Sequence, residues 1–317
     1  MKTTHQPTNP PIQQTLGETR YGTPPPDAIS VHQVGKVGSQ SVFRALQEQV
    51  DVPVYQTHVL NTTLRYFNEE EPAPPAGCDA LPPHVIRAQE LMSRFLQPGR
   101  PLAIITPVRD PVARNISGFF QNLNRFPHLI ADGGYAPMAD FLDTFFTQWK
   151  HREADDWFKY NYLQPFGVDV FTHPFNRERG YDSFADGNRV FLLMQMELDD
   201  ATKAEAVRSL LGLRSFSLAE RVNVSGDKPY AEAYKAFLDA IRLERGYLDE
   251  VYATRVAEHF YTPEQLAGFR ATWEQAAVKR GAGSQGTTHA GKGVSTSGPA
   301  AKRDRGRSGW IRRLFRA

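Results

Sequence analysis

The chain has 317 residues, of which 40% are hydrophobic and 23% charged, and this composition excludes a fully disordered, collagenous or disulfide-stapled protein. The single cysteine, Cys78, excludes an internal disulfide and a cysteine-based zinc site. The net charge of +2 hides an uneven distribution. Residues 280–317 carry nine Lys/Arg against Asp304 alone, whereas residues 1–279 carry 28 basic and 34 acidic residues. A tail of net charge +8 therefore follows a body of net charge −6.

The two ends of the chain differ from its middle. Residues 1–27 hold six prolines and almost no aliphatic side chains, so we expect them to be disordered. Residues 280–317 are rich in Gly, Ser and Thr and then basic, which predicts a second disordered segment. No stretch approaches the ~18 consecutive apolar residues of a membrane span, and the polar start lacks the apolar core of a signal peptide. The sequence therefore predicts a cytoplasmic protein with one folded domain over 28–279.

Between these ends, β-like and helix-like patterns alternate, which predicts an α/β fold with a central, mostly parallel sheet. The run PLAIITPVRD (101–110) is continuously apolar until its end, as expected of a parallel strand that is buried on both faces. A helix is expected over 111–123, because Pro111 suits a first helical position. The other expected strands are 28–34, 52–59 and 188–197, and the other expected helices are 41–50 and 85–95, with a Pro-rich loop over 71–84 and mostly helix over 199–279.

The loop after the first expected strand reads Gly35-Lys36-Val37-Gly38-Ser39-Gln40-Ser41. In α/β proteins such a loop cradles phosphate, because backbone N–H groups and the helix dipole converge there. Lys36 supplies a cation, and Ser39 and Ser41 supply hydroxyls at the helix start. A Walker A loop places its Lys directly after the last Gly, whereas Lys36 precedes Gly38, and this order disfavours an ordinary kinase or ATPase. The alternative is a plain turn with a serine N-cap.

A second cation is expected where the buried strand ends. Arg109 is placed at the carboxyl edge of the sheet, where α/β proteins bind ligands, and Ser117 follows eight residues later in the next helix. An Arg at that edge needs an anionic partner. The alternative is that Arg109 pairs with Asp110 or another carboxylate and that Ser117 faces solvent.

In order and spacing, these segments resemble the sulfotransferases that use 3′-phosphoadenosine-5′-phosphosulfate (PAPS). HQVGKVGSQSV (32–42) is similar to their 5′-phosphosulfate loop, and RDPVARNISGFF (109–120) to their 3′-phosphate motif, in which Arg and Ser are eight residues apart. ERVNVSGDKPYAEAYKAF (220–237), with 157–181 and 259–273, resembles bacterial members described as capsular polysaccharide synthesis proteins. The likeness covers roughly 28–275 and departs from the family pattern at Gln40, often Ser or Thr, and at Pro229, commonly aromatic. It implies a P-loop-like, three-layer α/β/α domain.

The resemblance also implies a role for each matched residue. Lys36 would contact the 5′-phosphate and the bridging oxygen that becomes the leaving group, where charge grows in the transition state. Arg109 and Ser117 would bind the 3′-phosphate, a task that suits the planar, permanently charged guanidinium. Lys228 would close over the donor, unless it is an ordinary exposed lysine. PAPS is the only small molecule implied, and no metal is required. The 5′-phosphosulfate would be surrounded by backbone amides and serine hydroxyls of the loop, namely Val37, Gly38, Ser39, Gln40 and Ser41.

An acceptor hydroxyl loses its proton as it attacks sulfur, so a base is expected within hydrogen-bond reach. His58, near the end of the second expected strand, occupies a position similar to the catalytic histidine of many sulfotransferases and is our candidate. Its ordinary pKa of about 6.5 lets it accept a proton at neutral pH. The alternatives are a strand-end His58 bonded only to backbone and a carboxylate base such as Glu90. His32 is expected to be packed, and no context supports the other candidates, His84, His128 and His173.

The reaction implied by the family is in-line transfer of a sulfuryl group from PAPS to a hydroxyl of a glycan or glycolipid acceptor. Two other functions stay open: a P-loop kinase or NTPase, and a non-catalytic nucleotide-binding protein of polysaccharide assembly. The acidic body carries no recognised nucleic-acid-binding module, so we expect no nucleic-acid partner. The tail ends in an amphipathic pattern of Trp310, Ile311, Leu314 and Phe315 among arginines. This pattern suits peripheral contact with an anionic membrane, although a solvated end is the commoner outcome.

Overall fold

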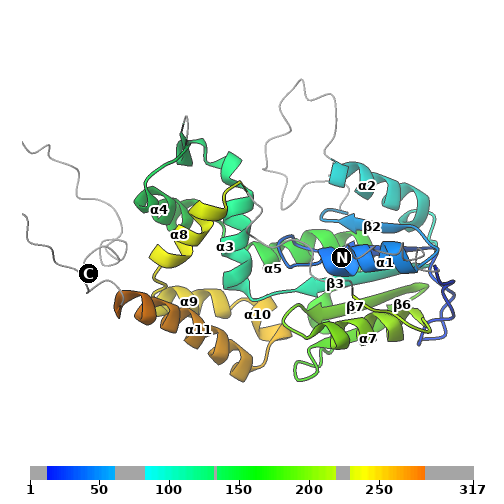
Figure 1. The fold of residues 1–317 in the computed structure, drawn as a ribbon. Helices are drawn as coiled ribbons and strands as arrows, with labels where there is room; N and C mark the ends of the chain where they lie inside the picture. The colour runs from blue at the N-terminus through cyan, green and yellow to red at the C-terminus, as the bar shows by residue number, and fades with distance from the viewer. Residues whose placement is uncertain (1–12, 61–82, 132–133, 219–228, 283–317) are drawn as a thin grey trace, which may run out of the picture.

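The computed structural model describes residues 13–60, 83–131, 134–218 and 229–282. Five strands form its central sheet in the order β2-β1-β3-β7-β6 (Figure 1). Four of them are parallel, namely β1 (Ala28–His32), β2 (Val54–Thr57), β3 (Leu102–Val108) and β7 (Arg189–Gln195), whereas β6 (Tyr181–Asp186) pairs antiparallel with β7 at one edge. The predicted α/β fold with a mostly parallel sheet is confirmed.

β3 lies in the middle of the sheet, and all seven of its side chains are buried. Leu102 and Ile104 pack into the apolar cluster on one face, and Ala103 and Ile105 into the cluster on the other. Successive side chains of a strand point to opposite faces, so a strand covered on both sides needs an unbroken apolar run. The position of β3 therefore follows directly from its sequence.

Helices cover both faces of the sheet, which gives the expected three layers (Figure 1). On one face, α1 (Gln40–Gln49) and α7 (Asp200–Leu211) bury Leu46 and Val207 against the sheet. On the other face, Trp157 and Phe158 anchor the helical layer. That layer consists of α2 (Pro83–Leu91), the π-helical turns η1 (Met92–Leu96) and η4 (Lys159–Leu163), α5 (Glu153–Phe158), α6 (Gln164–Phe166), the 3₁₀ turn η5 (Val170–Thr172) and α10 (Arg255–Phe260).

A third apolar cluster lies beyond the end of β3, where the chain leaves the sheet (Figure 1). The ring of Phe119 on α3 is its centre and lies 5.4–6.3 Å from the rings of Phe120, Phe126, Phe141, Phe145, Trp149 and Phe237. Because Phe237 belongs to α8, this packing holds α8 against α3. The helices of the cluster are α3 (Pro111–Gln121), α4 (Met138–Gln148), α8 (Ala231–Ala240), α9 (Arg245–Tyr252) and α11 (Pro263–Ala282). Between α3 and α4 the chain forms the turns η2 (Leu123–Arg125) and η3 (Pro127–Leu129) and the paired strands β4 (Ile130–Ala131) and β5 (Gly134–Tyr135).

Three details differ from the sequence-based expectations. β6 was not expected, because its mixed sequence leaves all six side chains half-buried. Residues 13–27, expected to be disordered, lie against the domain: Gln14 pairs with Val50, and Leu16 is 5% exposed. The end of α1 offers them backbone partners and an apolar surface that composition does not reveal. The last helix runs to Ala282, three residues into the expected tail.

Several expectations fall outside the described residues. These are the ends 1–12 and 283–317, most of the Pro-rich loop, and Lys228. In the described part of the chain, no helix is both long and apolar enough to cross a bilayer.

Candidate functional site

The order of the strands brings the three sequence-predicted segments together. β1 lies between β2 and β3, and in this register His32 pairs with Thr57. The loop after β1, His58 after β2 and Arg109 after β3 therefore meet at the carboxyl edge of neighbouring parallel strands. This edge is where α/β proteins place their ligands.

The loop between β1 and α1 has an unusual backbone. Gly35, Lys36 and Gly38 have φ angles of 84°, 61° and 83°, whereas Ser39 is right-handed at −71°. Lys36 is the single non-glycine residue with positive φ in the described ranges, a conformation that costs about 1–3 kcal/mol. Left-handed and right-handed residues in succession turn their N–H groups toward one side, which forms a concavity suited to an anion.

The start of α1 continues this concavity. Ser39 does not cap the helix with its side chain, so the alternative of a plain turn with a serine N-cap is not what forms. Instead, the Ser39 hydroxyl oxygen accepts a hydrogen bond from Gln56 Nε2 at 3.0 Å, and Gln40 Nε2 donates to Gln56 Oε1 at 2.8 Å. The first N–H groups of a helix have no intrahelical acceptor and attract anions. Ser41, half-buried, is in this first turn.

Two cations lie at the loop. Arg109 Nη1 donates to the carbonyl oxygen of Lys36 at 3.1 Å, and Lys36 Nζ donates to Gln121 Oε1 on α3 at 3.0 Å. The alternative pairing of Arg109 with Asp110 does not form: the Asp110 carboxylate accepts bonds from its own helix start and from Tyr252 and Trp273. Arg109 is thus held by a neutral carbonyl and keeps its charge available to an anion.

Polar side chains of two facing helices, α3 and α8, lie next to these cations. Ser117 and Gln121 are four residues apart on α3, and Tyr230 and Tyr234 are four apart around the start of α8, so each pair shares one helix face. Tyr230 donates to Gln121 Oε1 at 3.5 Å. Burial raises the pKa of Tyr234, whereas the charge of Arg109 and a hydrogen bond from Ser117 lower it. Gln121, Tyr230 and Tyr234 were not predicted as site residues, although their spacing is visible in the sequence.

His58 directly follows β2 and is half-buried. Its Nδ1 donates to the carbonyl oxygen of Gln33 at 3.0 Å, which fixes the tautomer and makes Nε2 the basic nitrogen. Burial lowers the pKa of His58, and the charges of His84 and Arg87 lower it further. The His84 ring is centred 6.0 Å from the His58 ring, so His84, which lacked supporting context in the sequence, lies beside the candidate base.

The other proton-transfer candidates are already engaged. Glu90 accepts hydrogen bonds from Tyr55 at 2.9 Å and Arg94 at 2.6 Å, and these lower its pKa, which weakens it as a base. His32 is fully buried, as expected, between Thr57 and the carbonyl oxygen of Asn161. His128 bonds to Thr144, and His173 stacks on Phe184.

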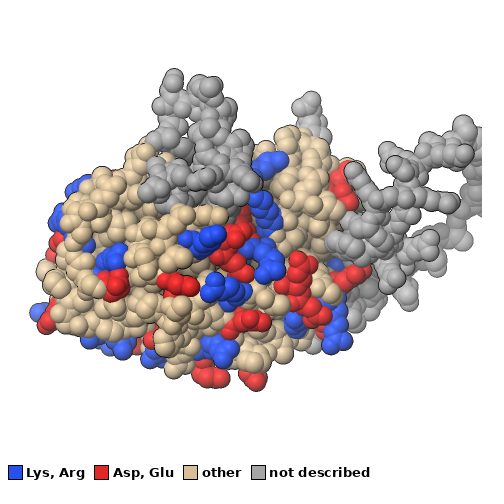
Figure 2. All heavy atoms as spheres, turned by 180° about the vertical axis from the view of Figure 1, so that it is seen from behind, with Lys and Arg blue, Asp and Glu red and all other residues tan. Residues whose placement is uncertain are grey.

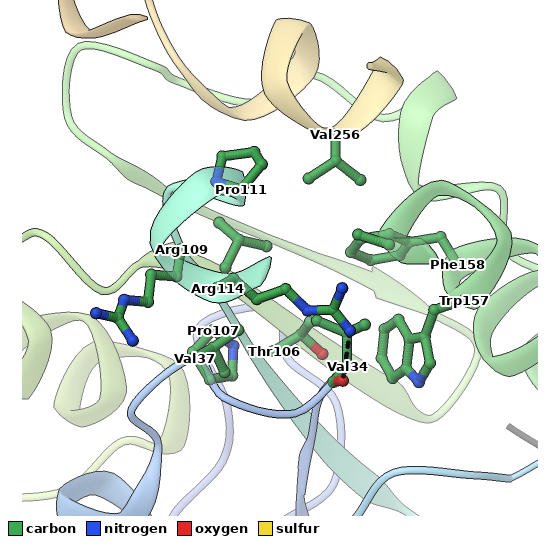
Figure 3. Close-up of a pocket in the computed structure, with 12 residues that line it drawn as sticks. Val34, Val37, Thr106, Pro107, Arg109, Pro111, Arg114, Trp157, Phe158 and Val256 are labelled. Carbon is green, nitrogen blue, oxygen red and sulfur yellow. Dashed lines mark hydrogen bonds between the residues drawn. The ribbon is translucent and has the colours of Figure 1, made fainter. Parts of the chain in front are cut away.

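A cavity of about 20 Å³, roughly one water molecule, lies behind the loop. Val34, Val37 and Arg109 line it on the loop side, but Lys36, Ser117 and His58 are not among its lining residues. In Figure 3 the Arg109 guanidinium points away from the other lining side chains, whereas the Arg114 guanidinium extends toward the carbonyl oxygen of Val34. Two predicted site residues, Val37 and Arg109, therefore border this cavity, whereas the phosphate-loop lysine and the candidate base do not.

Comparison with known proteins gives one match. Residues 137–262 match a family model described as "NKWYS: Putative capsular polysaccharide synthesis protein". This range is less than half of the chain. It includes α8 and the preceding Tyr230, but neither the loop after β1 nor Arg109 and Ser117. The searches of curated proteins and of solved structures found no match. The match supports the capsular polysaccharide part of the resemblance seen in the sequence.

Proposed function

We propose that this protein transfers a sulfuryl group from PAPS to a hydroxyl of a carbohydrate acceptor. The observation that carries the proposal is the convergence of Lys36, Arg109 and the start of α1 at one sheet edge. Three positive features at that edge fit a donor with a phosphate at one end and a phosphosulfate at the other. The segments that supply them are those that resemble the PAPS-binding motifs.

In the proposed reaction, the acceptor oxygen attacks sulfur in line with the leaving group. A new O–S bond forms, and the bond between sulfur and the bridging oxygen breaks. The electron pair of that bond stays on the 5′-phosphate of the departing adenosine 3′,5′-bisphosphate. Lys36 and the amides of the loop stabilise the negative charge that grows on this oxygen. His58 Nε2 takes the acceptor proton.

The donor would lie along the carboxyl edge of the sheet. The 5′-phosphosulfate would occupy the backbone concavity from Val37 to Ser41, with the Ser39 proton free to donate because Gln56 already donates to its oxygen. The 3′-phosphate would lie at Arg109 and Ser117. Lys228 lies outside the described residues, three positions before the first residue of α8, so its closing over the donor remains part of the proposal.

The acceptor class rests on the family match. The matched model is described by its link to capsular polysaccharide synthesis, and a polysaccharide presents many hydroxyl groups that could accept the sulfuryl group. A glycan under assembly, free or attached to a lipid, is therefore the acceptor that we propose.

Replacing Lys36 with alanine tests the proposal. We expect wild type to move radiolabelled sulfate from PAPS to a capsular oligosaccharide and Lys36→Ala to lose at least about a hundredfold in kcat, because the leaving oxygen loses its stabilising charge. Lys150→Ala, at an exposed lysine after α4, is the matched control and should retain full activity. Tight binding of ATP without affinity for adenosine 3′,5′-bisphosphate would instead indicate the kinase or NTPase alternative.

A further inference from the structure

Two pairs of polar side chains face each other where α8 packs on α3, each next to a cation. At one, Tyr230 and Lys36 both donate to Gln121 Oε1, at 3.5 and 3.0 Å. One helical turn away on each helix, Ser117 and Tyr234 form the second pair, and the charge of Arg109 acts on Tyr234. The Phe120 ring packs edge-on against Tyr234 at 5.1 Å and 5.9 Å from Tyr230, which fixes both phenols against α3.

The Tyr234 hydroxyl is placed to give a proton to an anion. Burial raises the pKa of the Tyr234 phenol, so the group keeps its proton at neutral pH and can donate it in a hydrogen bond. The Arg109 charge acts on the same group. A phenol that is half-buried beside a guanidinium can contribute a short, directional hydrogen bond to a phosphate oxygen, and bonds to charged groups are stronger than neutral ones.

We propose that Tyr234 is a direct ligand of the donor's 3′-phosphate, together with Arg109 and Ser117. The inference rests on the proposed function, because it names a further residue of the same phosphate site. It also gives α8 a binding role: the helix that follows the Lys228 segment supplies one wall of the site, and Phe237 anchors that wall in the third apolar cluster.

The test compares two nucleotide probes by isothermal titration calorimetry on the full chain. Adenosine 3′,5′-bisphosphate carries the 3′-phosphate, and adenosine 5′-monophosphate lacks it. We expect Tyr234→Phe to weaken the bisphosphate by about tenfold or more and to leave the monophosphate within about twofold, because only one hydroxyl is removed. Tyr135→Phe is the matched control: it removes a hydroxyl from a 40% exposed tyrosine that bonds to the Pro229 carbonyl oxygen, and it should change neither affinity.

Each of the other possible results of this calorimetric comparison leads to a single conclusion. If wild type binds the bisphosphate no better than the monophosphate, the phosphate site and the proposed function both fail. If wild type prefers the bisphosphate and Tyr234→Phe keeps that preference, only the role of Tyr234 is overturned. If Tyr234→Phe weakens both probes equally, the residue acts through packing and the proposal is again wrong. An unchanged thermal midpoint in Tyr234→Phe establishes that the fold is retained.

Discussion

At the scale of single residues, the protonation state of His58 decides how the proposed site can work. The bond from Nδ1 to the Gln33 carbonyl oxygen leaves Nε2 as the proton acceptor, and burial lowers the pKa of the ring. A lowered pKa keeps the imidazole neutral at neutral and mildly acidic pH, at the cost of some basicity. His58 is therefore suited to accept a proton over a wide pH range.

We expect His58→Ala to reduce kcat for sulfuryl transfer by about 10²–10⁴, the usual contribution of a general base. Affinity for adenosine 3′,5′-bisphosphate should stay within about twofold, because the proposed reaction places His58 at the acceptor and not at the nucleotide. In wild type, kcat should be flat near pH 7–8 and decline only below about pH 6.5, since the neutral form of a histidine with a lowered pKa persists there. His128→Ala, at an exposed histidine, is the control. A variant that keeps full kcat would exclude His58 as the base.

At the scale of elements, a buried ion pair supports the loop that carries Lys36. Arg114 on α3 pairs with Glu153 at the start of α5, and both side chains are only 5% exposed. Arg114 also reaches the carbonyl oxygen of Val34 at 3.5 Å, directly before the left-handed residues. Since buried pairs add little net stability over apolar residues, we infer that this pair positions the loop.

We expect Glu153→Gln to lower the free energy of unfolding by about 3–5 kcal/mol in urea titrations, because the Arg114 charge would stay buried without its counter-charge. The double variant Arg114→Met, Glu153→Leu should recover most of that stability. It should still bind adenosine 3′,5′-bisphosphate more weakly than wild type, since the support beneath Val34 is gone. Equal affinity in the double variant would exclude a positioning role.

At the scale of the whole molecule, buried neutral histidines tie stability to pH. Burial lowers the pKa of His32 to about 3 and that of His151 to about 4. His32 Nε2 donates to the Asn161 carbonyl oxygen, so Nδ1 must accept from Thr57, and protonation of Nδ1 would break that bond. Both rings are protonated more easily in the unfolded chain than in the fold.

The free energy of unfolding should therefore be largest above about pH 6.5, where both rings are neutral in either state. It should fall as pH drops from 6.5 toward 4, by up to about 1.4 kcal/mol per pH unit for each ring. Urea titrations at several pH values measure this slope. His151→Gln removes one of the two titrating rings, so the slope should fall by up to about 1.4 kcal/mol per pH unit. An unchanged slope in that variant would contradict the assignment to His151.

Charge is also distributed at the scale of the molecule. On the face in Figure 2, Lys and Arg side chains are interspersed with Asp and Glu. The sequence-based expectation that no nucleic acid is bound stays a prediction. The expected membrane contact belongs to the tail, outside the described residues.

Local patterns in the sequence determined the sheet and the placement of the candidate anion site. The apolar run of β3, the glycines around Lys36 and the spacing of Arg109 and Ser117 are properties of neighbouring residues, so periodicity and turn chemistry reveal them. β6 and residues 13–27 were missed because their order depends on surfaces supplied by other segments.

The tertiary structure alone decided which side chains surround the cations. Tyr234 meets Ser117 across 117 positions of chain, His84 approaches His58 from α2, and Glu153 pairs with Arg114 from α5. Such contacts depend on how α8 and α5 pack, and that packing is set by the free energy of the whole core, including Phe119 and Phe237. A sequence pattern encodes which face of a helix is buried, but only the assembled core selects the surface that buries it.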